Sequence, residues 1–261
     1  VPVGRAWKRH GVTHVMLQNI YGDPTVADRY AQSCRMFDRA QNILQQENIH
    51  FRSVVRTWIY LDEILDWYGE FNRARNTRFT EYGLLGLSEK ENTEAEQIYL
   101  PASTGILGKN PHGASGTMDV WAVDSSNNGV YISQTSGVEQ KSPYRYGSAF
   151  SRAMTLKEKD VTHILLSGTA SIDEHGKTVY LDNPSEQMRK TLQVVQSLIK
   201  WEGASLDHIQ EATVFFKCAK DAQYYDKVAK EFGIKDLPAV FVVADVCRQD
   251  LLFEIDAAIA F

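Results

Sequence analysis

The 261-residue sequence has no long hydrophobic run and no concentration of charge of one sign. No apolar stretch approaches the roughly 20 residues of a membrane-spanning helix, and no segment near the N-terminus resembles a signal peptide. We therefore expect no membrane partner. The net charge is −5 at pH 7 and neither half is basic. We also expect no nucleic-acid partner, because phosphate binding requires a concentrated basic face.

Cysteine is scarce: the chain has three, an odd number, and none is in a CxxC pair. This argues against a disulfide framework and against a structural zinc site, and it favours a reducing cytoplasm. The sequence also contains no P-loop, no GxGxxG fingerprint and no GxSxG elbow. We therefore expect neither a metal nor a cofactor. The hydrophobic content of 43% is typical of a globular protein.

The sequence repeats itself, and an internal repeat is more informative than any local pattern. Five short segments of the first half have counterparts in the same order in the second half. The paired segments are 13–17 with 162–166, 23–24 with 183–184, 56–61 with 212–217, 81–83 with 231–233, and 100–102 with 237–239. We predict a first, degenerate module over 1–124, a linker over 125–146, and a second module over 147–261.

Each copy has the same predicted order of elements. A strand precedes a helix that begins at Asp23 or Asn183, polar residues that can cap free amides and that are each followed by proline. A β-rich run and a second helix follow, and Gly83 or Gly233 ends that helix. A final strand closes each copy. The pattern predicts an α+β fold in which two helices cover one face of each mixed β-sheet.

Several motifs of the second copy resemble the RidA (YjgF) superfamily. Residues 147–153 and 166–170 resemble its opening strands, and 237–239 and 253–260 resemble its final hairpin. The resemblance implies chorismate-mutase-like modules and a homo-oligomer, commonly a trimer, with ligand sites between modules. Imine deaminases of the superfamily carry a carboxylate-binding arginine just after the Leu-Pro-Ala segment, where this chain has Val240.

Within the superfamily the sequence is most similar to the chorismatases, relatives that hydrolyse chorismate. The similar segments occur in both copies and are 55–61, 71–75, 101–106, 150–153 and 167–172. Cys247 and Glu254, seven residues apart, look like the active-site pair of that group. The resemblance implies that Glu254 acts as an acid and that Cys247 shapes the pocket and influences the product.

Glu254 lies among Leu251, Leu252, Phe253 and Ile255, a run that predicts a strand with apolar neighbours. A carboxyl group partly withdrawn from water has a raised pKa and can deliver a proton near neutrality. An exposed glutamate on the solvent face of the strand is the alternative. For Cys247 the alternative to a catalytic role is a small buried apolar side chain.

Arginines are candidates for binding a substrate carboxylate, because the guanidinium group can donate two parallel hydrogen bonds. Arg152 lies in an otherwise apolar strand, and Arg73 and Arg75 lie on a predicted helix, where solvated charge is the alternative. The segment Ser167-Gly168-Thr169 could offer an N–H group and a hydroxyl to an anionic oxygen, although a plain strand turn explains it equally well.

We expect an enzyme that binds a small carboxylated metabolite, with chorismate as one candidate, and that uses Glu254 as general acid and releases pyruvate. An imine or enamine deaminase of RidA type is one alternative. A metabolite-binding module without catalysis is the other. We further expect a homo-oligomer, with a trimer favoured, because two modules alone do not complete a threefold arrangement.

Overall fold

A computed structural model describes residues 3–85, 100–124, 129–135 and 149–261 of the chain. The first module consists of β1 (Gly4–Arg9), β2 (Val12–Tyr21), α1 (Arg29–Gln46), β3 (Val54–Leu61), α2 (Ile64–Glu81), β4 (Ala102–Leu107) and β5 (Gly116–Asp124). The second consists of β6 (Val130–Thr135), β7 (Ala153–Glu158), β8 (Thr162–Ala170), α3 (Pro184–Trp201), β9 (Ile209–Phe216), α4 (Tyr225–Glu231), β10 (Ala239–Val243) and β11 (Phe253–Ala260). Short 3-10 turns precede β3, β9 and α4 at Phe51–Ser53, Leu206–His208 and Ala219–Tyr224.

The two sheets have the same topology. Their strand orders are β1-β2-β5-β3-β4 and β10-β9-β11-β8-β7-β6. Each sheet is mixed, because the β3–β4 and β9–β10 pairs are parallel and the remaining pairs are antiparallel. Arg56 pairs with Ala102 in the first sheet and Ala212 pairs with Ala239 in the second, the register that the sequence repeat predicts. The chain is therefore an α+β protein of two tandem modules.

The second sheet has one strand more than the first. This strand, β6, pairs antiparallel with β7 at the sheet edge and lies within the segment 125–146 that was expected to be a linker. Residues 130–135 thus form part of the second sheet instead of a connection between modules. The remainder of that segment, 125–128 and 136–146, lies outside the described residues.

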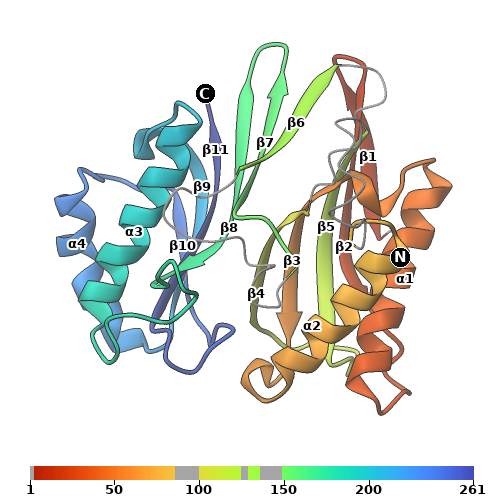
Figure 1. Cartoon of the computed structure of the whole chain (residues 1–261), viewed down its shortest axis with the longest axis horizontal. Helices are drawn as coiled ribbons and strands as arrows, with labels where there is room; N and C mark the ends of the chain where they lie inside the picture. Colours follow the sequence, from red (N-terminus) through yellow and green to blue (C-terminus); the bar gives the residue numbers. More distant parts are fainter. Residues whose placement is uncertain (1–2, 86–99, 125–128, 136–148) are drawn as a thin grey trace.

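The modules form four layers, with the two sheets facing each other in the middle and the helices outside (Figure 1). Apolar side chains from both sheets, among them Val55, Ala102, Met154 and Leu165, form one buried cluster between them. A backbone hydrogen bond from the β4 residue Leu107 to a carbonyl just after β10 also crosses between the modules. The two modules of the chain therefore pack directly on each other.

Helix starts follow the capping rules in one copy and depart from them in the other. Asn183 caps α3 as predicted, with proline at the first helical position. The helix α1 begins five residues later than predicted, because Asp28 is its N-cap. Asp23 instead accepts hydrogen bonds from Thr25 and from Arg35, whose Nη1 atom lies 2.6 Å from Asp23 Oδ2. The expectation that Asp23 caps this helix is therefore wrong.

The second helix of each module ends as predicted, although the two helices differ in length. Gly83 and Gly233 both have a φ of 74°, a left-handed conformation that glycine adopts without steric strain. The α2 helix has 18 residues and α4 has seven. The longer α2 brings side chains of the first module to the boundary between modules.

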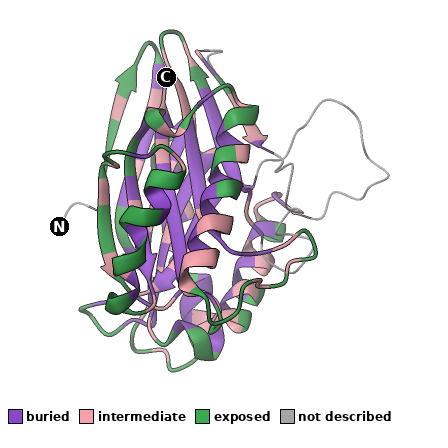
Figure 2. Cartoon of the chain, turned by 90° about the vertical axis from the view of Figure 1, so that its left-hand side faces the viewer, coloured by how far each residue is buried: buried purple, intermediate pink, exposed green. Residues whose placement is uncertain are grey.

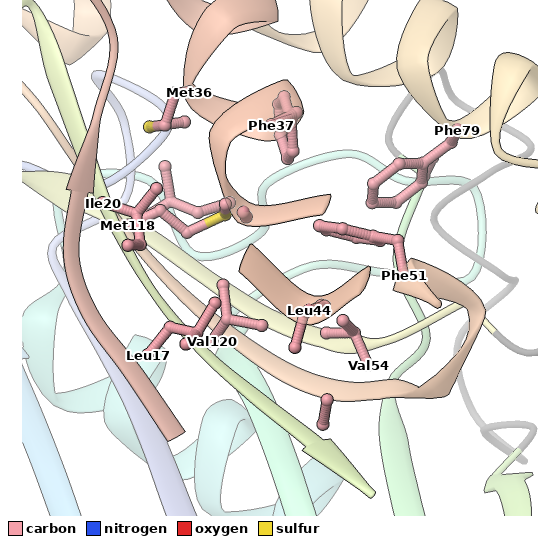
Figure 3. Packing of buried hydrophobic residues seen from close by; sticks show 14 of the residues in the cluster. Leu17, Ile20, Met36, Phe37, Leu44, Phe51, Val54, Phe79, Met118 and Val120 are labelled. Atoms are coloured by element: carbon pink, nitrogen blue, oxygen red, sulfur yellow. The ribbon is translucent and has the colours of Figure 1, made fainter. Parts of the chain in front are cut away.

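Each module has its own core between helices and sheet. In the first module, Phe37 of α1, Phe79 of α2 and Phe51 pack together over the strands (Figure 3). In the second module, α3 buries a continuous apolar face that includes Leu192 and Val195, while its outer face is exposed (Figure 2). These cores fix each sheet against its helices, so that the opposite faces of the two sheets are left to pack on each other.

Candidate active site

A cavity of about 190 Å³ lies at the boundary between the modules. The first module contributes side chains of α2 to its lining, and the second contributes β8, β11 and the loops that precede β7 and β11. Among the lining residues are Tyr68, Asn72, Phe150, Arg152, Arg248 and Cys247, together with Gly168 and Glu254. Glu254, Cys247, Arg152 and Gly168 are four of the residues singled out from the sequence. The fold brings them together from segments far apart in the chain.

Glu254 is a buried acid on β11 with an exposed fraction of 4%. Burial disfavours the charged form and, together with the nearby charge of Asp256, raises the pKa of Glu254 to about 8, while Arg56 and Arg152 act against this shift. At neutral pH the carboxyl group therefore carries a proton. The register of β11 also shows that Glu254 corresponds to Met118 in the first module, so this acid occurs in one copy only.

Gly168 provides the space that the Glu254 carboxyl group occupies. A Cβ atom added at Gly168 would overlap Oε1 of Glu254 and approach the Thr104 side chain. The absence of a side chain therefore allows the acid to lie directly against the β8 backbone. Any larger residue at this position would displace it.

Cys247 lies in the cavity wall as a neutral thiol. Burial and the neighbouring Glu254 raise its pKa to about 12. A thiolate is the nucleophilic form of cysteine, so this environment does not favour covalent catalysis at neutral pH. The position agrees with a side chain that shapes the pocket.

Two buried guanidinium groups flank the Phe150 ring. The Cζ atom of Arg152 lies 6.0 Å from the ring centroid and that of Arg75 lies 5.5 Å from it. Both arginines are at most 3% exposed. Arg152 lines the cavity itself, whereas Arg75 contacts lining residues, donating a 2.6 Å hydrogen bond to Asn72 and another to Tyr68. This end of the cavity is therefore positively charged.

Arg73 does not reach the cavity, contrary to the expectation from sequence. Its side chain is 67% exposed, forms a 3.2 Å ion pair with Glu70 and lies over the Tyr30 ring. Arg73 and Arg75 are two residues apart, which on a helix corresponds to nearly opposite directions. The rotation of α2 therefore buries Arg75 and exposes Arg73.

The Ser167-Gly168-Thr169 segment does not present hydroxyl groups to the cavity. The Ser167 hydroxyl donates to the carbonyl of Ser151 and accepts from the N–H of Ser103, and the Thr169 hydroxyl donates to the carbonyl of Ser167. Of the three, only Gly168 lines the cavity. Its N–H donates to Thr104 Oγ1 over 3.1 Å. The expected anion site on Ser167 and Thr169 is replaced by structural hydrogen bonds.

Sequence reasoning missed Tyr68, Asn72 and Arg248 as cavity residues. Tyr68 and Asn72 are four residues apart and therefore share one face of α2. Burial raises the pKa of Tyr68 to about 12, so its hydroxyl remains protonated and able to donate. Tyr68 and Asn72 precede Arg75 by seven and three residues, so helical spacing from Arg75 could have identified this face of α2. Arg248 follows Cys247 directly, and nothing in its local pattern separates it from an ordinary turn residue.

Neither a metal-binding cluster nor a membrane-spanning helix occurs in residues 3–85, 100–124, 129–135 and 149–261. Within them, no group of three or more His, Cys, Asp or Glu side chains is placed to hold a metal ion. Also within them, no helix combines the length and apolar character needed to cross a membrane.

Comparisons with known proteins identify relatives of both halves. Residues 146–261 match the family model described as Endoribonuclease L-PSP, the RidA family. The 3-hydroxybenzoate synthase of Streptomyces hygroscopicus is 25% identical over 237 residues, which are 82% of this chain and 65% of that protein. A solved chorismatase has a TM-score of 0.75 at 17% identity, with 98% of this chain and 77% of that chain covered. This structural likeness establishes a shared fold.

Proposed function

We propose that the chain is a hydrolase or lyase of a small carboxylated metabolite, with chorismate as its substrate. The match of residues 146–261 to the Endoribonuclease L-PSP family model and the fold that the two modules share with a chorismatase support this proposal. The observation that carries the proposal is Glu254, a protonated buried acid in a cavity that also contains guanidinium groups. Such a site pairs a proton donor with groups that attract a carboxylate.

In the proposed reaction Glu254 is the general acid. It donates its proton to the methylene carbon of the enol ether of chorismate, which produces an oxocarbenium ion and leaves Glu254 as a carboxylate. Water adds to that cation and releases its proton to Glu254, and the resulting hemiketal breaks down to pyruvate and the ring alcohol. A pKa of about 8 suits this role, because the acid is loaded at neutral pH and remains strong enough to transfer its proton.

The arginines have the binding role in this proposal. Arg152 would hold a substrate carboxylate with its planar guanidinium group, and Arg248 lines the same cavity and adds positive charge. Arg75 does not line the cavity, but it would hold Tyr68 and Asn72 in place there through its hydrogen bonds to both. Holding the ring in one orientation would align the methylene carbon with the acid, and such positioning can lower a reaction barrier substantially.

The named relatives support the same class of reaction. One is a 3-hydroxybenzoate synthase and one is a chorismatase, although the chain spans only 65% of the length of the first. A RidA-type imine deaminase receives no comparable support. Val240, which occupies the position of the deaminase arginine, is 65% exposed and does not line the cavity.

The test measures chorismate loss and pyruvate release by the purified chain, beside an assay with 2-aminoacrylate. We expect equimolar pyruvate from chorismate, abolished in Glu254→Gln and retained in Glu174→Gln, a control at an exposed loop carboxylate. Turnover of 2-aminoacrylate alone would assign the chain to the deaminases. Binding of chorismate without turnover of either compound would assign it to the non-catalytic class.

A further inference from the structure

A buried ion pair joins the two modules close to the cavity. Nη2 of Arg56, on β3 of the first module, lies 2.8 Å from Oδ2 of Asp256, on β11 of the second. The two residues are 2% and 3% exposed. The Arg56 guanidinium also lies 4.6 Å above the Trp58 ring. Both side chains of the pair are therefore almost completely buried.

Thr104 of β4 connects this pair to the wall of the cavity. Its hydroxyl donates to Asp256 Oδ2 over 2.7 Å and lies 2.6 Å from Arg56 Nη2, from which it accepts. It also accepts the N–H of Gly168 over 3.1 Å. Gly168 is the residue against which the Glu254 carboxyl group lies. A continuous chain of polar contacts therefore extends from Arg56 to the backbone that supports the acid.

This arrangement occurs once, although the modules are repeated. The strand registers identify an apolar counterpart in the other copy for each of its three members. The equivalent pairs are Arg56 with Ala212, Asp256 with Val120, and Thr104 with Phe241. Glu254 likewise has an apolar counterpart, Met118. The polar network therefore occurs beside the acid Glu254, and the positions equivalent to both in the other copies of the strands hold apolar residues.

Stability alone does not explain a buried ion pair, because an apolar pair of similar volume is often equally stabilising. The presence of this ion pair is better explained by the effect of its charges on Glu254. Asp256 lies two residues from Glu254 on the same strand and disfavours its ionisation, whereas Arg56 favours it. The pair therefore places two opposite charges near Glu254, and the balance between them affects how readily its carboxyl group ionises.

We propose that Arg56, Asp256 and Thr104 are positioning residues for Glu254, holding its carboxyl group against Gly168 and balancing the charge around it. Because the network crosses between modules, the acid has this environment only when the two modules are packed together. The catalytic meaning of this assignment rests on the proposed function, in which Glu254 donates a proton. The positioning itself can be measured without substrate.

The experiment follows the protonation of Glu254 directly by carbon-13 NMR of labelled glutamate carboxyl groups, with Glu254→Gln identifying the resonance. In Asp256→Asn the positive charge of Arg56 is uncompensated, so the Glu254 pKa should fall by about one unit or more. In Arg56→Met the negative charge of Asp256 is uncompensated, so the Glu254 pKa should rise. Opposite shifts from the two variants are the signature of the proposed balance.

Thr104 supplies a second test that leaves the charges in place. Thr104→Val removes the hydroxyl at nearly constant volume and should lower kcat about tenfold or more with little change in KM, because the support of Gly168 is loosened. Thr104→Ser keeps the hydroxyl and should restore most of the activity. A purely structural role would lower the melting temperature of both variants without this difference in kcat.

Arg189→Met is the matched control, since it removes an ion pair with Glu231 between α3 and α4 of the same module. It should leave the Glu254 titration and turnover unchanged. Unmoved titration in Asp256→Asn, together with equal kcat for Thr104→Val and Thr104→Ser, would overturn the proposal. If charge variants shift the titration while the parent fails to turn over chorismate, the proposed function fails and the positioning role stands.

Discussion

Replacing Glu254 with glutamine should inactivate the protein and at the same time stabilise it at alkaline pH. Glutamine has nearly the shape of a protonated glutamic acid but carries no ionisable proton. The parent, in contrast, must keep a carboxyl group neutral in a buried cavity wall. Activity and stability should therefore respond to this one substitution in opposite directions.

The size of the stability change follows from the two pKa values of the carboxyl group. The ordinary value of 4.5 applies to the unfolded chain, and burial raises the folded value to about 8. Between them the folded chain retains a proton that the unfolded chain releases, so rising pH favours unfolding. At about 1.4 kcal/mol per pKa unit, the parent loses roughly 4–5 kcal/mol of stability by pH 9 through this group. Below about pH 4 both states are protonated and the loss disappears.

The assay is urea unfolding of parent and Glu254→Gln at a series of pH values between 4 and 9. Other titrating groups are common to both proteins, so their contributions cancel in the difference. We expect similar unfolding free energies at pH 4 and a growing advantage of the variant up to pH 8, where it levels off. Turnover of the variant should be lower by about 100-fold to 10,000-fold throughout.

A difference in unfolding free energy that stays constant from pH 4 to pH 9 would refute this reasoning. It would mean that Glu254 has similar pKa values in the folded and unfolded states, and hence that burial does not load the acid. Equal turnover of the two proteins would separately remove Glu254 from the mechanism. The activity of the parent gives a third measure, since kcat should fall as pH rises through about 8.

Arg152→Lys keeps the charge but loses the planar fork, so calorimetry should show about tenfold or more weaker binding of a carboxylated ligand, and unchanged binding would assign Arg152 to structure. Gly168→Ala should lower kcat about 100-fold with the fold retained by circular dichroism, because the added methyl group displaces Glu254; parental kcat would contradict this steric account. Burial lowers the pKa of His14, so its neutral form stabilises the fold above pH 6.5 and that stability is lost on acidification; His14→Gln should lose less stability than the parent between pH 6.5 and 5, and parallel losses in urea unfolding would contradict this. Light scattering should show a homo-oligomer, a trimer by the family resemblance, and a monomer of 29.5 kDa would mean that the two modules suffice for each other.

The two modules and their elements could be predicted from sequence because they depend on interactions between near neighbours. The repeat shows in the chain itself, Asn183 caps its helix locally, and Gly83 and Gly233 adopt a conformation that favours glycine in any context. Local rules were insufficient where two neighbouring polar residues competed. Asp28 caps α1 in place of Asp23.

Some residues of the candidate site could likewise be recognised from their near neighbours in the sequence, whereas others depend on contacts between the modules. Glu254 and Arg152 stood out because a charged residue in an apolar run requires a partner or a function, although Arg152 lies just before β7 and not in the strand that its neighbours predict. The choice between Arg73 and Arg75 could not be made from the helix alone, since it depends on which face of α2 meets the second module. The choice between an anion site and a plain strand turn at Ser167-Gly168-Thr169 likewise could not be made from sequence, because it depends on the partners of the Ser167 and Thr169 hydroxyl groups.

The sequence by itself therefore predicted the two modules and singled out Glu254, Cys247, Arg152 and Gly168 as candidate site residues. Only the tertiary structure decided that Tyr68 and Asn72 line the same cavity as Glu254, and that Arg56 pairs with Asp256, 200 residues away in the chain. The physical reason is that burial and contact between modules are properties of the packed sheets. The pKa of Glu254 rises chiefly because the packed modules exclude water from it, and the charge of Asp256, two residues along β11, adds to that effect.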